Sequence, residues 1–505
     1  MREHGVVVKK CRGCLRVAVL YPGPYKAMVH SLAVHIIYYM LNSMDGVAAE
    51  RFCVGGGCPR GRSLETGAPL RGFDLVLASV SYEPQLGALV EALAAGGVEP
   101  RRARRRGGPV VVAGGPGVMS NPLPAAAVAD AVAVGEAEEL LPAIIGAAME
   151  GGRWLEGVAG RGVYVPGAGR ARRVWVRVLD EAFHPVLEFR VPGSGEPWGE
   201  AYMVEVSRGC CSMCSFCMES RLLHPLRHRS LRVVERLVEE GVRVNRVGRV
   251  ALYSLNLLAR RDAGRLLGVI VDEMGLGVSA GSLRVEEVDE ELLGVLARGG
   301  QRVATLAPET LVERLQAVTW KRFSMERLEW AVREAVRLGM HPKLYLILCL
   351  PGETGEDVRE EAARLRRLYR LSGGRLRCSA NPLIPKPWTP MQWLGLPPRR
   401  LYEARLAALR RAAPVAGLPW REAVLQVAIS RGGVEVGEAL VEAVMEGGGL
   451  SPAGLRRAAS RRGVDWASLL SPIPLDEEPP WSRVVDMGVP TASLRRAWEA
   501  IAGSL

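Results

Sequence analysis

The stretch AYMVEVSRGCCSMCSFC, residues 201–217, decides how this chain of 505 residues is organised. Its first six residues, Ala201–Val206, are mostly apolar, as in a buried strand. Three thiols, Cys210, Cys214 and Cys217, follow within eight residues. Iron–sulfur clusters are held by cysteine thiolates and usually take four, so a three-cysteine loop leaves one iron open to a small molecule. The pattern predicts a metal-binding loop at the end of a strand.

A structural zinc site formed by the three cysteines and His224 is the alternative. Structural zinc sites usually have two separated C-x-x-C or H-x-x-x-H pairs, and this loop lacks that spacing. Cys211 is not expected to be a ligand, because adjacent side chains diverge along an extended chain.

Composition indicates an ordinary globular protein of several domains, with 48% hydrophobic and 24% charged residues. The net charge is +12, and 60 of the 66 basic residues are arginine. A basic surface attracts nucleic acids or acidic substrates. A codon bias that spreads arginine over solvated faces is an equal alternative, and the run Arg101–Arg106 has the same two interpretations.

No stretch approaches the roughly 18 apolar residues of a membrane span. The N-terminus is basic but has no long apolar region, unlike a signal peptide. We therefore expect a cytoplasmic protein without a membrane partner.

The first 150 residues alternate between strand and helix patterns, which predicts an α/β fold with a doubly wound, Rossmann-like parallel sheet. Ligands of such sheets bind at the carboxyl ends of strands, where Tyr21-Pro-Gly, Ser79 and Gly114-Gly115 fall. The strand patterns are residues 15–20, 73–80, 109–113 and 131–134, and a helix pattern covers residues 26–41.

After the cysteine loop, helix and buried-strand patterns repeat, which predicts a partial parallel (β/α) barrel with its active groups at the strand ends. The predicted strands are residues 247–254, 277–282, 303–307, 343–350 and 375–380. Polar residues follow several of them and could bind a ribose, an ammonium group or a carboxylate: Ser254, Asn256, Ser282, Arg284 and Glu309.

The C-x-x-x-C-x-x-C spacing, with Phe216 before the last cysteine, resembles the cluster loop of radical S-adenosylmethionine (SAM) enzymes. The resemblance implies a 4Fe–4S cluster on Cys210, Cys214 and Cys217 and reductive cleavage of SAM to a 5′-deoxyadenosyl radical, or support of a methyl- or methylthio-type transfer. It also implies an electron donor such as ferredoxin or flavodoxin. The residues expected near SAM are Phe216, Ser254, Asn256, Ser282, Arg284 and Glu309.

Further motifs resemble a branch of these enzymes with a cobalamin-binding-type N-terminal domain and largely unassigned reactions: Tyr21-Pro-Gly, Ala113-Gly-Gly-Pro, Leu350-Pro-Gly-Glu-Thr and the segment Asn381–Trp393. Ser79, Gly114 and Gly115 match the small residues that line the cobalamin cavity. The D-x-H-x-x-G loop of that family is missing after the first strand. His30 and His35 lie on the next predicted helix and are expected to be packed or solvated.

Two other positions depart from the pattern. Cys349 stands where a glycine is expected before Leu350-Pro-Gly-Glu, and a side chain there would crowd a close backbone approach. Ser254-Leu-Asn replaces the usual G-G-E-type segment. Cys11, Cys14, Cys53 and Cys58 are expected to be local thiols or disulfides, because about six residues of strand separate the two pairs by roughly 20 Å.

The predicted organisation is a cobalamin-binding-like domain (1–150), a linker with a short hairpin at 173–179 (151–196), a radical SAM core (197–415) and a helical C-terminal region (416–505). That region is predicted to have helices at 435–445 and 455–461 and a loop at 479–489. Lys386 lies in a Pro-rich segment that either closes the barrel mouth or braces two domains.

The sequence thus predicts a radical SAM enzyme that binds a 4Fe–4S cluster and SAM. The resemblance leaves cobalamin binding and an RNA substrate open and assigns no catalytic residue. A non-catalytic iron–sulfur protein associated with RNA is the alternative.

Overall fold

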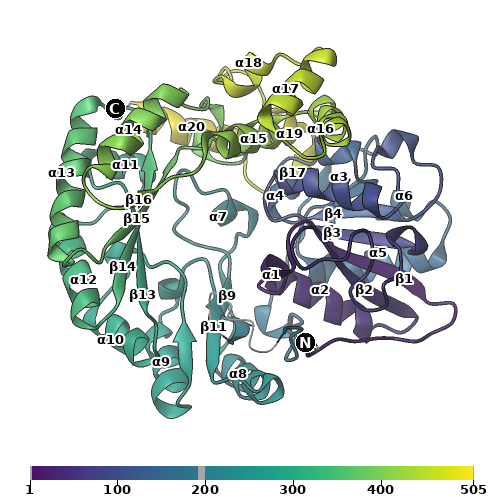
Figure 1. Ribbon diagram of the computed structural model, residues 1–505, viewed down its shortest axis with the longest axis horizontal. Coiled ribbons are helices and arrows are strands. Elements are labelled where there is room, and N and C mark those ends of the chain that lie inside the picture. Colours follow the sequence, from purple (N-terminus) through teal and green to yellow (C-terminus); the bar gives the residue numbers. More distant parts are fainter. Residues whose placement is uncertain (1–2, 192–199, 504) are drawn as a thin grey trace. The chain divides into compact units, whose positions relative to one another are not determined.

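Figure 1 shows the computed structural model, which describes residues 3–191, 200–503 and 505. Its contacts divide the chain into two compact units, neither of which is contiguous in sequence. The first unit comprises Met1–Ser194, Lys386–Trp388 and Val424–Thr491, and the second comprises Gly195–Pro385, Thr389–Ala423 and Ala492–Leu505.

The first unit contains a six-stranded sheet in the order β2-β1-β3-β4-β5-β6. All neighbours pair in parallel except β6, which is antiparallel to β5. The predicted doubly wound sheet is therefore confirmed. Its strands are β1 (Leu15–Tyr21), β2 (Val47–Cys53), β3 (Leu75–Ser79), β4 (Val110–Gly114), β5 (Ala131–Ala133) and β6 (Val163–Tyr164).

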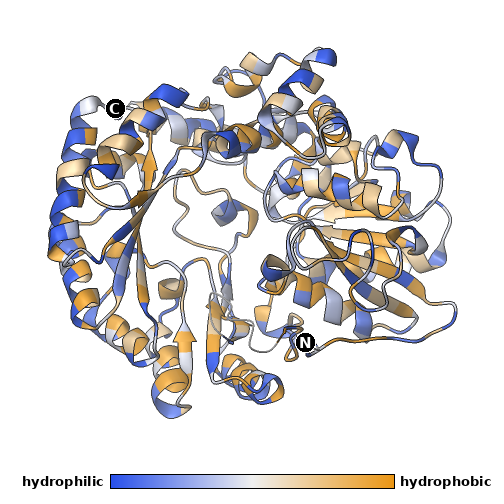
Figure 2. Ribbon diagram, viewed as in Figure 1, coloured by the Kyte–Doolittle hydropathy of each residue, from blue (hydrophilic) through white to orange (hydrophobic). Residues whose placement is uncertain are grey.

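The strands of this sheet are buried on both faces, as parallel sheets covered by helices require. Val17 and Val19 of β1 join a core with α2 (Leu32–Ser43) and α5 (Ala137–Glu150), while the alternate residues Ala18 and Leu20 are buried as well. Figure 2 shows these strands as mostly hydrophobic. Helix α3 (Gln85–Ala95) packs against α16 (Val434–Gly447), so residues far apart in sequence complete this unit.

The helix predicted at residues 26–41 is two helices, α1 (Tyr25–Met28) and α2. Ser31 precedes α2 in an extended conformation, with φ −93° and ψ 96°, and this interrupts the helical path. His30 therefore lies in the break between the helices and not on a helix.

The hairpin predicted at residues 173–179 is wrong. The nearby strand β7 (Ala171–Arg172) pairs in parallel with β17 (Val485–Asp486), a partner more than three hundred residues away that local alternation cannot reveal. Accordingly, the predicted loop at 479–489 contains α19 (Pro480–Val484) and β17. The turn-rich residues that follow Val191 lie outside the described part of the chain.

The predicted C-terminal helices are confirmed as α16 and α17 (Pro452–Arg461). The Asn121 amide of the first unit donates to the backbone oxygens of Ser430 (3.0 Å) and Gly432 (2.8 Å), at the end of α15 (Trp420–Arg431). These bonds fix the start of α16 against the segment that follows α4 (Pro116–Met119).

The second unit contains an open barrel of parallel strands, as predicted. One sheet has the order β12-β11-β8 and the other β13-β14-β15-β16. Leu283 joins them, because its N–H donates to Thr305 O (2.8 Å) and its carbonyl accepts from Ala307 N (3.0 Å). The strands are β8 (Tyr202–Glu205), β11 (Arg249–Tyr253), β12 (Gly277–Ser279), β13 (Val303–Glu309), β14 (His341–Leu348), β15 (Arg377–Pro382) and β16 (Val415–Ala416).

Helices cover the outer side of this barrel, as Figure 1 shows for α10, α12 and α13. Leu344, Leu346 and Leu348 of β14 are buried, whereas the alternate residue Tyr345 is exposed. The strand therefore has one apolar face and one accessible face. The covering helices are α8 (Leu231–Asn245), α10 (Glu290–Arg298), α12 (Met325–Arg337) and α13 (Gly355–Leu371). None of the described helices has the length and apolar character needed to cross a bilayer.

Candidate functional site

The cysteine loop, residues 209–218, follows β8 and the short strand β9 (Ser207–Arg208) in the second unit. Cys210 and Cys214 are buried and Cys217 is half-buried, whereas Cys211 is exposed. Gly209 has φ +87°, and a Cβ there would lie 2.5 Å from the carbonyl oxygens of Leu223 and Pro225. Glycine is thus required where the loop begins.

Arg221 organises this loop from α7 (Glu219–Leu222). Its guanidinium is buried and donates to the carbonyl oxygens of Met213 (3.1 Å), Cys214 (2.8 Å) and Cys217 (2.8 Å). One rigid cation therefore holds the backbone beside two of the three thiols. The sequence analysis missed Arg221, since one arginine among 60 carries no distinguishing pattern.

The far side of the loop is anchored on α11 (Glu313–Thr319). The Ser215 hydroxyl donates to Val318 O at 2.5 Å, and Ser215 is fully buried. Phe216 packs on an apolar cluster that includes Leu315 and Leu350. The aromatic residue predicted to lie near SAM therefore also fixes the loop.

The donor set of this loop suits an iron–sulfur cluster. Its three thiols are soft ligands on one segment, and in a 4Fe–4S cluster each thiolate binds a different iron, so the ligands need not converge on one ion. Within the described part of the chain, no three His, Cys, Asp or Glu side chains converge on a single metal position. His224, the fourth ligand of the zinc alternative, is exposed, whereas Cys210 and Cys214 are buried. Burial raises the pKa of the Cys217 thiol.

Arg284 and Asn256, two residues predicted to contact SAM, lie in one network with a cluster cysteine. Arg284 donates to Cys214 Sγ at 3.2 Å and forms ion pairs with Glu286 and Glu287. The Asn256 amide donates to Glu287 Oε1 at 3.3 Å. The structure thus brings two strand ends to the cysteine loop and gives the Arg284 guanidinium two carboxylate partners that the sequence analysis did not foresee.

The remaining predicted SAM residues lie at other strand ends. Ser254 shares a 2.6 Å hydrogen bond with Ser207. Glu309, with φ +66°, pairs with the buried ammonium of Lys321, whose Nζ lies 2.8 Å from Glu309 Oε1. Ser282 is exposed and lines a pocket of about 470 Å³ between the end of β12 and the start of β13.

Cys349 follows β14 with φ +64°, in the left-handed region that favours glycine. The departure noted in the sequence is thus a strained position. Burial raises the pKa of the Cys349 thiol to about 11. The nearby Glu353 carboxylate accepts from Leu350 N (2.8 Å) and from Arg405 (3.1 Å), and burial raises its pKa to about 7.

Ser79 and Gly114 end neighbouring strands of the first unit and are register partners. The strand order reverses between β1 and β3, and ligands of doubly wound sheets bind outside the carboxyl ends of strands at such a switch point. Gly115 has φ +104°, and a Cβ there would lie 2.5 Å from Val80 O. This glycine is therefore required by the approach of its own chain, whatever it binds.

Other residues singled out in the sequence have structural partners in the first unit. His35 is fully buried and stacks on Phe189 with ring centroids 3.7 Å apart, and burial lowers its pKa to about 3. Cys11 bonds to Cys14 and Cys53 to Cys58, so the local pairing is confirmed. The Lys386 ammonium lies 2.7 Å from Glu83 Oε1 and 3.1 Å from Gln426 Oε1.

Comparison with known families now decides which class of cysteine loop this is. The family described as "Radical SAM superfamily" matches residues 204–365, which contain the three cysteines and Arg284. The family described as "Radical SAM proteins, N-terminal" matches residues 33–166. The chain belongs to the radical SAM superfamily. It is therefore an enzyme, and the family implies a 4Fe–4S cluster and SAM as its cofactors.

Two curated relatives extend the comparison of this radical SAM enzyme. An uncharacterized protein of Methanocaldococcus jannaschii (MJ0966) is 28% identical over 379 residues, which cover 74% of this chain and 78% of the relative. An uncharacterized methyltransferase of Pyrococcus horikoshii (PH0819) is 27% identical over 261 residues, or 49% of this chain and 56% of the relative.

The fold is similar to that of the radical SAM methyltransferase TsrM from Kitasatospora setae. A structure of TsrM with cobalamin and a [4Fe-4S] cluster bound has a TM-score of 0.57 and 18% identity, covering 75% of this chain and 74% of TsrM. A second TsrM structure, with tryptophan and a SAM analogue bound, has a TM-score of 0.54 and 16% identity, with 72% of each chain covered. The expected combination of folds is confirmed at this level.

Proposed function

We propose that this enzyme cleaves SAM reductively at the three-cysteine loop and directs the product toward a substrate in the open barrel. The contact between Arg284 and Cys214 Sγ, at 3.2 Å, carries the proposal, because it places a guanidinium from a strand end directly beside a cluster cysteine. When bound, a reduced 4Fe–4S cluster supplies the electron for SAM cleavage. A one-electron donor such as ferredoxin or flavodoxin would be its partner.

In this proposal the chain's own residues bind and orient SAM. Cys210, Cys214 and Cys217 hold three irons, and the Arg284 guanidinium pairs with the SAM carboxylate in two-point geometry. Ser254, Asn256, Ser282 and Glu309 supply hydroxyl, amide and carboxylate groups at strand ends for the ribose and the ammonium, and Phe216 packs beneath the loop. Arg284 would exchange part of its pairing with Glu286 for the SAM carboxylate.

The test is anaerobic purification, addition of SAM and dithionite, and measurement of 5′-deoxyadenosine and S-adenosylhomocysteine. We expect at least one of these products, and none from the triple variant Cys210→Ala, Cys214→Ala, Cys217→Ala. A preparation with intact iron and sulfide that forms neither product would contradict the proposal.

We further propose that the first unit binds cobalamin at the carboxyl ends of β1, β3 and β4, where Ser79, Gly114 and Gly115 lie. The support is the reversal of strand order between β1 and β3 and the fold shared with TsrM. After β1 the chain reads Tyr21-Pro-Gly-Pro, so this loop offers no histidine to cobalt. A methyl transfer would follow from this cofactor.

Corrinoid content after anaerobic reconstitution with cobalamin tests this second proposal. We expect the protein to retain corrinoid and Ser79→Tyr to lose it, because a large side chain would fill the strand end. Ser43→Tyr, at an exposed position of the same unit, should retain it. Equal retention by both variants, or none by the unmodified protein, would remove cobalamin from this site.

A further inference from the structure

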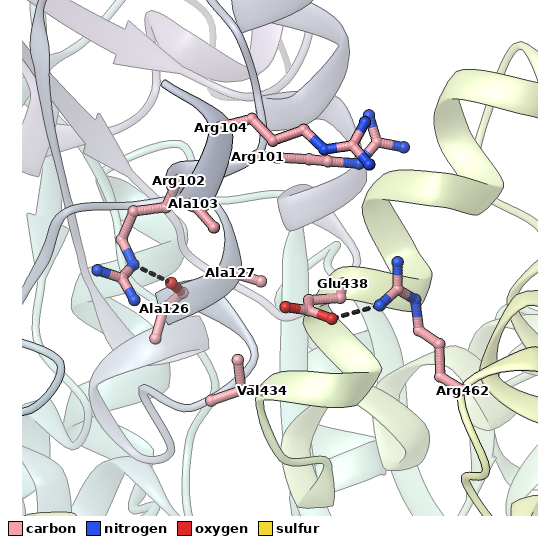
Figure 3. Close-up of a pocket in the computed structure, with 9 residues that line it drawn as sticks. All are labelled: Arg101, Arg102, Ala103, Arg104, Ala126, Ala127, Val434, Glu438 and Arg462. Carbon is pink, nitrogen blue, oxygen red and sulfur yellow. Dashed lines mark hydrogen bonds and ion pairs between the residues drawn. The ribbon is translucent and has the colours of Figure 1, made fainter. Parts of the chain in front are cut away.

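A basic pocket of about 180 Å³ lies in the first unit, outside the residues assigned above. Three segments form it: the turn η2 (Arg102–Arg104), the turn η3 (Ala125–Ala127) and the helices α16 and α17. Figure 3 shows its lining, which is Arg101, Arg102, Ala103, Arg104, Ala126, Ala127, Val434, Glu438 and Arg462.

Arginines face this pocket from two sides. In Figure 3 the side chains of Arg101 and Arg104 lie next to each other, and Arg462 points toward the pocket from the opposite side. Arg102 turns away and donates to Ala126 O at 2.9 Å. The pocket therefore gathers three guanidiniums, the groups that pair best with phosphate oxygens.

Acidic groups neutralise only part of this charge. Arg462 pairs with Glu438 and, at 3.1 Å, with Glu442, whereas Arg101 lies 3.8 Å from Glu99. No carboxylate of the described residues pairs with Arg104, which is exposed. Two neighbouring guanidiniums repel each other, so an anion between Arg101 and Arg104 would be stabilising.

Positive charge continues beyond the pocket on both of its basic segments. Arg106 is exposed on the loop that carries Arg104, and its printed bond is to Ala103 O at 3.4 Å. Helix α17, which precedes Arg462, carries exposed Arg456 and Arg457, and no carboxylate of the described residues pairs with either. A single small phosphate would use the pocket alone, whereas a polymer of phosphates would use these flanking arginines as well.

The chemistry of the lining indicates which part of a polymer would bind. Besides the arginines and Glu438, the wall consists of alanines and Val434, without an aromatic ring on which a base could stack. We infer that this pocket binds the phosphodiester backbone of a nucleic acid, as a non-specific contact separate from the site of radical chemistry. Such contacts position a nucleic acid without reading its sequence.

The test measures binding of a fluorescently labelled single-stranded RNA to the full chain by anisotropy at several KCl concentrations, without SAM or reductant. Failure here is therefore distinct from failure of the radical chemistry. The double variant Arg101→Gln, Arg104→Gln removes two pocket charges. The matched control Arg177→Gln, Arg483→Gln removes two exposed charges of the same unit outside the pocket.

We expect the pocket variant to bind roughly ten-fold more weakly, with the slope of log K against log salt reduced by about two, because each lost phosphate contact releases about one counterion fewer. The control should change affinity less than about two-fold. DNA of the same sequence should bind with similar affinity. Equal weakening in both variants, no RNA binding at low salt, or displacement of RNA by millimolar inorganic phosphate would overturn the inference.

Discussion

Arg221 shows how one side chain sets the geometry of the cysteine loop. Its buried guanidinium bonds to three loop carbonyls, so its removal would leave those oxygens without donors in a buried site. We predict that Arg221→Lys lowers the iron and sulfide retained per chain several-fold after anaerobic reconstitution, although the charge is kept. Arg236→Lys, at an exposed position of α8, is the control. Equal iron content in both variants would contradict this role.

Cys349 is a second residue whose backbone matters as much as its side chain. A non-glycine residue in the left-handed region costs about 1–2 kcal/mol. Both Cys349→Ala and Cys349→Gly remove the buried thiol, but only glycine also relieves the backbone. We therefore predict that Cys349→Gly is more stable than Cys349→Ala by about 1 kcal/mol. Denaturant unfolding of the two variants measures this difference, and equal stability would show that φ +64° is not strained.

Helix α16 tests how closely distant parts of the first unit pack. A Cβ at Gly437 would lie 2.0 Å from Pro124 O, whereas nothing lies within 4 Å of a Cβ at Gly447 on the same helix. We predict that Gly437→Ala destabilises the protein by about 1–3 kcal/mol, because the backbone must move apart. Gly447→Ala should leave stability unchanged or raise it by up to about 1 kcal/mol. Thermal unfolding of both variants decides, and similar effects would rule out this close contact.

The stability of the whole chain should depend on pH through a buried carboxylate, Glu361 on α13. Burial raises its pKa to about 8, and its Oε1 accepts from Leu311 N at 3.0 Å. The folded state therefore holds a proton that the unfolded chain releases near pH 4.5. This stabilisation is complete at low pH and is lost as pH rises through about 8.

We predict that the unmodified protein loses about 1–3 kcal/mol of stability between pH 5 and pH 9 relative to Glu361→Gln, which cannot ionise. Glu356→Gln, at an exposed position of the same helix, should follow the unmodified protein. Unfolding measured across this pH range checks the difference. Parallel pH profiles for all three proteins would show that Glu361 is not the group responsible.

The sequence by itself determined what depends on short stretches of chain. Buried-strand runs predicted the doubly wound sheet and the strands of the barrel, because apolar periodicity is a local consequence of burial. The spacing of Cys210, Cys214 and Cys217 predicted the cluster loop, because three ligands on one segment need no information from elsewhere. The glycine expected at position 349 marked a backbone conformation that the structure contains.

Only the tertiary structure decided which distant residues meet. It paired β7 with β17, placed α16 against Pro124, and joined Arg221 and Arg284 to the cysteine loop. It also brought Arg101, Arg104 and Arg462 to one pocket. Such contacts depend on how the chain returns upon itself, and an arginine pattern looks alike on a solvated face and in a binding site. Local periodicity therefore gave the elements, and long-range packing gave the sites.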